Sequence, residues 1–144
     1  MKNSLLLRNS IVAASVVFAT YTAYTFSSQA PPNANGSPGS NGNTCASATC
    51  HSGPAVSDQT ITITSDIPSA GFSANTDYTI TVTADRGTSS ASTSGFEVSV
   101  ENSGGNDQGT LSTGGNSNVR LVGMGSFVSH NGKQSFTGGQ SVWT

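Results

Sequence analysis

The chain has 144 residues, only 8% of them are charged, and the formal net charge is −2. This length suits one small domain beside its N-terminal segment. Basic residues form no cluster, so electrostatics gives no support for binding to nucleic acid or to an anionic membrane surface.

The N-terminal segment has the features of an export signal. Lys2 and Arg8 precede the apolar run Ile11 to Ala19. This run is too short for a typical membrane span. The small residues of Ser28 to Ala30 suit a signal peptidase, whereas Pro31 disfavours cleavage there. Residues 1–30 are predicted to be a signal peptide or an uncleaved N-terminal anchor. The protein is then extracytoplasmic: secreted, at the cell surface or associated with the outer membrane.

Residues 31–44 are predicted to be a linker. They are rich in Pro, Gly, Asn and Ser and show no hydrophobic periodicity. Such a stretch buries too little apolar surface to offset the conformational entropy lost on ordering. We therefore expect an extended tether from Pro31 to Asn43, with the cysteine motif at its end.

The motif of residues 45–53 contains both cysteines of the chain, Cys45 and Cys50, and His51 follows directly. This order is a stretched form of C-x-x-C-H, the attachment sequence of c-type haem. In that use, Cys45 and Cys50 bind the porphyrin through thioethers, and His51 binds the iron from one face.

Two other hypotheses for the motif stay open. Cys45 and Cys50 could form a local disulfide, which suits an exported chain. Alternatively, the two cysteines and His51, with His130, could bind Zn or Cu. If haem is bound, the candidates for a sixth ligand are His130 and Met124.

Residues 54–144 are predicted to form an antiparallel β-sandwich. Strict alternation of apolar and polar residues predicts strands that bury one face, at Thr60–Thr64, Tyr78–Thr83 and Phe96–Glu101. Weaker strands are expected at 109–112, 119–122, 126–130 and 141–144. Short strands between Gly-rich and Asn-rich turns indicate an all-β domain. The expected core residues are Ile61, Ile63, Tyr78, Ile80, Val82, Phe96, Val98, Val100, Leu121, Phe127 and Trp143.

The chain ends at Thr144, inside the last predicted strand. We therefore expect an incomplete sandwich, with an unpaired sheet edge and a poorly covered Trp143. A fragment of a longer protein would have this pattern.

The sequence contains no pattern typical of an enzyme. Aspartates are scattered without the spacing of a calcium loop, and no serine lies in a nucleophile-elbow motif. Glu97 and Glu101 are expected to face solvent from one side of a strand, with Ser99 between them. We therefore expect no catalytic site.

Several short motifs occur in a characteristic order from Pro31 to the end of the chain. They are Pro31-Pro32, Gly39, Asn43-Thr44-Cys45, Cys50-His51-Ser52-Gly53, Tyr78-Thr79-Ile80-Thr81-Val82, Gly95-Phe96-Glu97-Val98, Gly109-Thr110-Leu111, Phe127-Val128-Ser129-His130 and Ser141-Val142-Trp143-Thr144. In this order they resemble the bacterial choice-of-anchor V domain, a relative of the Reeler (reelin-type) domain.

This resemblance implies a Reeler-type or immunoglobulin-like sandwich that is secreted or surface-attached. It also implies a membrane or cell-wall anchoring region beyond Thr144, and no defined biochemical activity. Reeler-type domains occur beside haem-binding domains in membrane redox proteins.

Two functions are therefore expected. The first is a cell-surface module that carries haem c for electron transfer or haem-based sensing, with a redox partner. The second is a surface binding or adhesion module with a Cys45–Cys50 disulfide, no cofactor and a surface ligand.

Overall fold

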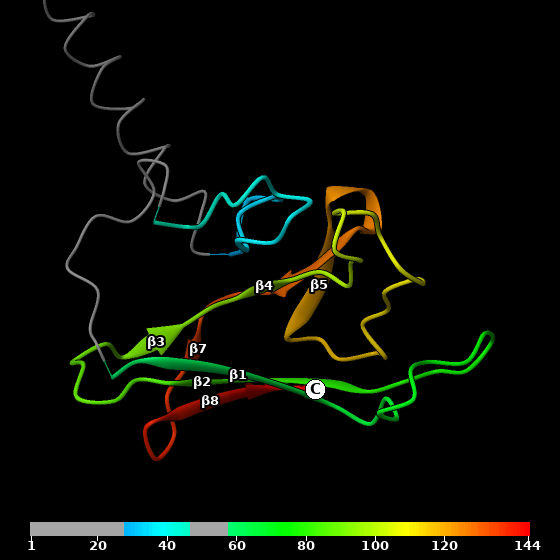
Figure 1. The fold of residues 1–144 in the computed structure, drawn as a ribbon. Helices are drawn as coiled ribbons and strands as arrows, with labels where there is room; N and C mark the ends of the chain where they lie inside the picture. The colour runs from blue at the N-terminus through cyan, green and yellow to red at the C-terminus, as the bar shows by residue number, and fades with distance from the viewer. Residues whose placement is uncertain (1–27, 47–57) are drawn as a thin grey trace, which may run out of the picture.

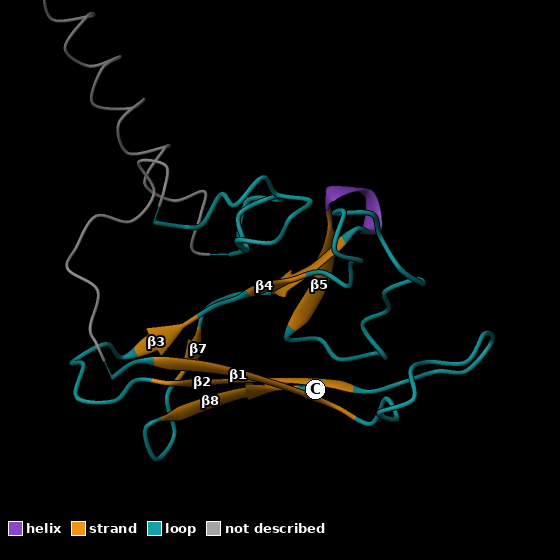
Figure 2. Cartoon of the chain, in the orientation of Figure 1, coloured by secondary structure: helices purple, strands orange, loops and turns teal. Residues whose placement is uncertain are grey.

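The computed structural model describes residues 28–46 and 58–144, which are almost entirely strands and loops. Figure 2 shows these strands and one helical turn. In chain order the elements are β1 (Thr60–Ser65), β2 (Ile80–Asp85), β3 (Thr93–Ser94), β4 (Glu97–Val98), β5 (Val119–Val122), η1 (Gly123–Gly125), β6 (Phe127–His130), β7 (Gln134–Ser135) and β8 (Gln140–Trp143).

Every strand pairing is antiparallel, and the strands form two main sheets (Figure 1). One sheet has the order β1-β2-β8, and the other has the order β4-β6-β5. A short β3-β7 pair continues from the second sheet toward the first. The prediction of an all-β, antiparallel, sandwich-like domain is confirmed.

The core lies between the two main sheets. On β2, Val82 and Ala84 are buried because alternate residues of a strand point to the same face. Phe96 packs on Trp143 of β8 with ring centroids 4.8 Å apart and planes tilted by 50°, a favourable arrangement for aromatic pairs. Trp143 is only 2% exposed. The expectation that this tryptophan is poorly covered was therefore wrong.

Residues 28–46 form a third layer, on the outer face of the β4-β6-β5 sheet (Figure 1). Ala30 is buried, and its N–H donates to the hydroxyl oxygen of Ser129 on β6 at 2.8 Å. Ser40 is also buried. This layer differs from the extended tether expected over Pro31 to Asn43. Hydrogen bonds to the sheet, together with the burial of Ala30, order the segment.

Other predictions needed correction at the level of single strands. Residues 109–112 form no strand, since Gly109 has a left-handed φ of 74° that interrupts extended backbone. The strand expected at 96–101 is reduced to β4, and β2 begins two residues later than expected. The short β3-β7 pair was not predicted.

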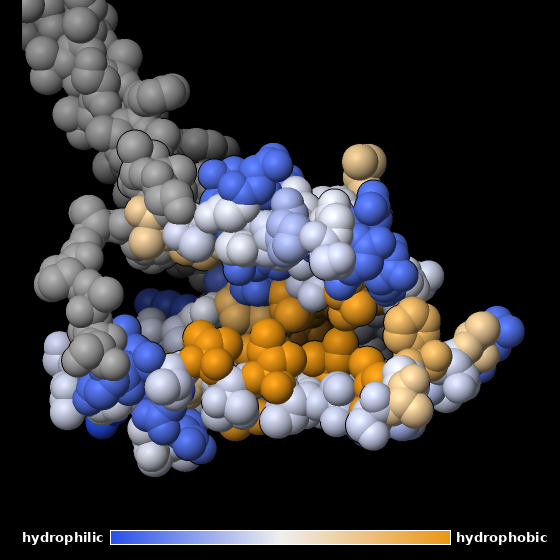
Figure 3. All heavy atoms as spheres, in the orientation of Figure 1, coloured by the Kyte–Doolittle hydropathy of each residue, from blue (hydrophilic) through white to orange (hydrophobic). Residues whose placement is uncertain are grey.

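Three expected core residues, Ile61, Ile63 and Leu121, are instead exposed. Ile61 and Ile63 are 59% and 55% exposed because β1 is an edge strand, and the second sheet does not cover it. Figure 3 shows a band of apolar side chains along the opening between the two main sheets. The alternation of β1 is therefore real, but its apolar face is uncovered.

Among the described residues, no helix is long and apolar enough to cross a membrane.

Candidate functional site

Cys45 lies at the foot of a closed loop of residues 34–45, called the Cys45 loop below. Asn35 and Thr44 form an antiparallel bridge that closes it. The Cys45 sulfur lies 3.4 Å from the carbonyl oxygen of Ala34, within hydrogen-bond distance for a thiol. The first residue of the cysteine motif therefore has a defined place in the fold.

Side chains that follow one face of the β4 segment hold the start of this loop. The Ala34 N–H donates to Glu97 Oε1 at 2.9 Å. The Asn35 side-chain amide donates to Ser99 Oγ at 2.7 Å. Alternate residues of extended backbone share a face, so Glu97 and Ser99 act together.

Glu101 continues this face and holds the tip of the Cys45 loop. Its Oε2 accepts a hydrogen bond from the Gly39 N–H at 2.7 Å, and its Oε1 accepts one from the Ser37 hydroxyl at 2.8 Å. Hydrogen bonds to an ionised carboxylate are stronger than neutral ones. Glu101 is therefore the main anchor of the loop tip.

Two glycines permit this close approach. A Cβ at Gly39 would lie 2.8 Å from Glu101 Oε2, and a Cβ at Gly105 would lie 2.7 Å from the Gly39 nitrogen. Both distances are shorter than real Cβ contacts. A side chain at Gly105 would meet the backbone of Pro38 and Gly39 and push the loop tip away, whereas a side chain at Gly39 would displace the Glu101 carboxylate that accepts its N–H.

The two carboxylates have opposite pKa shifts. Burial raises the pKa of Glu97 above its ordinary value, and hydrogen bonds from the amides of Ala34 and Asn33 oppose that rise. Hydrogen bonds from Ser99 and then Ser37 lower the pKa of Glu101. Glu101 is thus held in its ionised form, whereas burial disfavours ionised Glu97.

His130 has a structural contact in this fold. It is buried, and its Nδ1 lies 3.0 Å from the Phe96 nitrogen, where it can accept the backbone N–H. A Cβ at Gly95 would lie 2.6 Å from Nδ1, so a glycine is needed beside the ring. His130 lies on the core side next to Phe96, whereas the Cys45 loop docks on the other face of the sheet.

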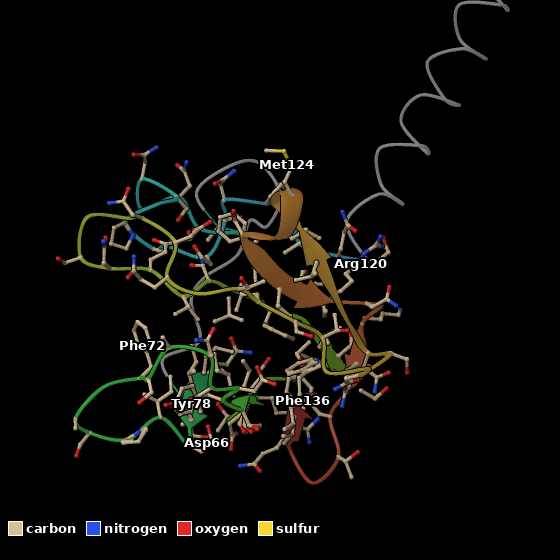
Figure 4. All side chains as sticks on the ribbon, turned by 90° about the vertical axis from the view of Figure 1, so that its right-hand side faces the viewer. Asp66, Phe72, Tyr78, Arg120, Met124 and Phe136 are labelled. Carbon is tan, nitrogen blue, oxygen red and sulfur yellow. The ribbon has the colours of Figure 1, made fainter. Side chains whose placement is uncertain are left out.

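The other predicted site residues are Cys50, His51 and Met124. Cys50 and His51 lie outside the described residues. Met124 is fully exposed on η1 and points away from the domain (Figure 4). Within residues 28–46 and 58–144, no group of three or more His, Cys, Asp or Glu side chains is placed to hold a metal ion.

Sequence reasoning missed the docking role of Glu97, Ser99 and Glu101. Their alternation in Glu-Val-Ser-Val-Glu was visible, and it correctly indicated one shared face. This face is only partly solvated, in contrast to the expectation, because the Cys45 loop hydrogen-bonds along it and leaves Glu97, Ser99 and Glu101 half-buried. The available signal was the row of polar side chains at every second position of residues 97–101, and nothing in it pointed to the Cys45 loop.

Comparison of the chain with known protein families, with characterised proteins and with solved structures finds no match. The fold and the site together define an antiparallel, two-sheet β-module with a docked N-terminal loop. The resemblance to the choice-of-anchor V domain remains a prediction from its motifs.

Proposed function

We propose that this chain is an exported, non-enzymatic cell-surface module that carries one c-type haem at Cys45, Cys50 and His51. The observation that carries this proposal is the docking of the Cys45 loop on the β4-β6-β5 sheet through Glu97, Ser99 and Glu101. Because the loop is docked, the first residue of the motif, Cys45, has a fixed position on the sheet. A covalently attached redox group needs such a fixed position to have a defined orientation.

The donor set fits this cofactor. Two thiols can each add S–H across one vinyl group of a porphyrin, without an external oxidant, and an adjacent imidazole can bind the iron. The haem would supply one-electron chemistry. Cys45 and Cys50 would hold the group, and His51 would be its proximal ligand. The docked loop would fix the position of Cys45 relative to the sheet.

We also propose that the module belongs with the choice-of-anchor V and Reeler-type sandwiches. The order of its motifs and the two antiparallel sheets support this assignment. Export and surface attachment follow from the signal-like N-terminus and from the same resemblance. Its partner would then be a redox protein at the cell surface.

The test is the intact mass of the exported full chain, made in a host with haem-attachment machinery. A gain of one haem mass that reductant does not remove, with a Soret band that survives denaturation, is the expected result. A Cys50→Ser variant should lose the stable double attachment, whereas an exposed control, Ser103→Ala, should keep it. An unmodified mass in this host would overturn the haem proposal.

The second candidate is a surface binding module with a Cys45–Cys50 disulfide. The uncovered apolar face of β1 favours it, because exposed apolar rows mark interaction surfaces. In this case the mass of the chain is lower by two hydrogens, and reductant restores them. Two thiols that react in the denatured protein before reduction would contradict this candidate.

A further inference from the structure

Among residues 28–46 and 58–144, the β1 strand is an open edge whose outer backbone groups have no strand partner. In the sheet order β1-β2-β8, its one strand partner in this part of the chain is β2, and all six of its residues are exposed. Such an edge is a template for another strand unless charges, proline or a covering element block it. The sequence Thr-Ile-Thr-Ile-Thr-Ser contains neither charge nor proline.

The pairing with β2 identifies the outward-pointing groups. The Asp66 N–H donates to the Thr79 carbonyl at 3.3 Å. Hydrogen-bonded and non-hydrogen-bonded pairs alternate along an antiparallel ladder. The N–H and C=O groups of Ile61, Ile63 and Ser65 therefore point away from β2, toward the open edge.

The side chains of β1 add an apolar row to this edge. Ile61 is opposite Ala84, and Ile63 is opposite Val82. Directly opposed residues share a face, so both isoleucines lie on the core side of the sheet. They remain more than half exposed there.

We propose that two copies of this chain associate through their β1 edges, antiparallel, about a two-fold axis at Ile63. In this register Ile63 is opposite Ile63 of the second copy, and Ile61 is opposite Ser65. All three outward N–H groups donate across the interface, and all three outward C=O groups accept. The result is one continuous sheet formed from both β1-β2-β8 sheets.

Charge disfavours one of the two neighbouring registers. The alternative that puts Ile61 opposite Ile63 also puts Asp58 of one copy opposite Asp66 of the other, and like charges directly opposed in a sheet are destabilising. The register centred on Ile63 puts Asp66 opposite Thr60. The formal net charge of only −2 per chain gives weak repulsion between the copies.

The pairing also brings the apolar rows together. Ile63 of one copy lies beside Ile63 of the other, and each Ile61 lies diagonally across from the other copy's Ile63, so the isoleucines cover part of one another. A C2 interface of this kind needs the same patch on both partners. The inference does not depend on haem attachment, because the Cys45 loop docks on the other sheet.

The test is sedimentation equilibrium of the exported full chain over a wide range of concentration. Wild type should shift from monomer to dimer. Ile63→Lys should weaken dimerisation by about tenfold or more, because it opposes two lysines at the axis. The matched control is Val142→Lys, also on an edge strand and 46% exposed, which should dimerise as wild type does. Fluorescence of the single, buried Trp143 checks that each variant is folded.

A mixing experiment tests the register itself. Ile63→Lys and Ile63→Glu should each dimerise about tenfold or more weakly than wild type, and a mixture of the two should form a heterodimer at concentrations where each variant alone is mostly monomeric, since residue 63 opposes itself. A wild type that stays monomeric at every concentration would overturn the pairing. A mixture that stays monomeric, beside a wild type that dimerises, would overturn the two-fold register.

Discussion

The two main sheets differ in how their faces are covered. Every residue of β6 is buried, because β6 is the central strand of its sheet and has the core on one face and residues 28–46 on the other. Every residue of β1 is exposed, although its alternation of Thr and Ile is the most regular in the chain. Burial thus depends on the neighbours of a strand more than on its own pattern.

The largest expected effect is the difference in stability between a core variant and a variant at the open edge. Phe96→Ala removes the ring that packs on Trp143, and should lower the free energy of unfolding by about 3–5 kcal/mol. Ile61→Ala removes a side chain that is mostly exposed, and should cost about 1 kcal/mol or less. Urea unfolding followed by tryptophan fluorescence measures both. Equal losses would contradict the contrast between the two regions.

The next effect concerns the outer layer. Ser129 is 0% exposed, and its hydroxyl accepts from the Ala30 N–H and donates to the Phe96 carbonyl. Ser129→Ala leaves that N–H without its acceptor, and should cost about 1–3 kcal/mol. Hydrogen exchange at Ala30 should become faster, whereas the exposed control Ser103→Ala should leave it unchanged. Unchanged protection at Ala30 would mean that this hydrogen bond does not hold the layer.

Acid should loosen the tip of the Cys45 loop. The folded-state pKa of Glu101 lies below its ordinary value of 4.5, so its contribution is full above that pH and is lost as the pH falls through the lowered pKa. The protection factor of the Gly39 amide, which is its exchange relative to the intrinsic rate at each pH, should therefore fall in acid, and Glu101→Gln should lower it already at neutral pH.

Glu97 supplies the control for that pH dependence. Burial raises its pKa, so its contribution is full below its ordinary value and is lost as the pH rises through the raised pKa. Glu97→Gln should therefore keep the acid-induced loss of protection at Gly39. Loss of the acid effect in this variant, rather than in Glu101→Gln, would reverse the assignment of the anchor.

The smallest effect is expected at η1. Met124 is exposed and has a left-handed φ of 59°, which is costly for a residue with a Cβ. Met124→Gly should raise stability by about 1 kcal/mol or less, because the greater entropy of unfolded glycine offsets part of the gain. Thermal unfolding measures it. Thr110→Gly, at an exposed position without positive φ, should instead be destabilising.

The bounds of four strands were predicted well from the alternation of their residues. β5 has the expected bounds, β1 and β6 differ by one residue at one end, and β8 is shifted by one residue at both ends. Val119 and Val122 were missed as core residues, and Leu121 was wrongly included. In a strand of four residues next to a turn, alternation alone does not specify which side is covered.

The sequence indicated single parts of the docking site, whereas the cofactor role of Cys45, Cys50 and His51 stays a prediction. Cys45 was identified from its spacing to Cys50 and His51, and the shared face of Glu97, Ser99 and Glu101 follows from period two. The docking of the Cys45 loop on that face was not predicted. Each of its hydrogen bonds to Glu97, Ser99 and Glu101 joins residues more than sixty positions apart, and no local pattern encodes such a pairing.

The sequence by itself determined the local features: antiparallel strands with one apolar face, turns at glycines and the cysteine motif after a polar segment. Side-chain alternation and backbone preference are properties of neighbouring residues, so a single chain reveals them. Only the tertiary structure decided which apolar faces are covered, that residues 28–46 form a layer, and that β1 is an open edge. Burial and long-range hydrogen bonds depend on which distant segments meet.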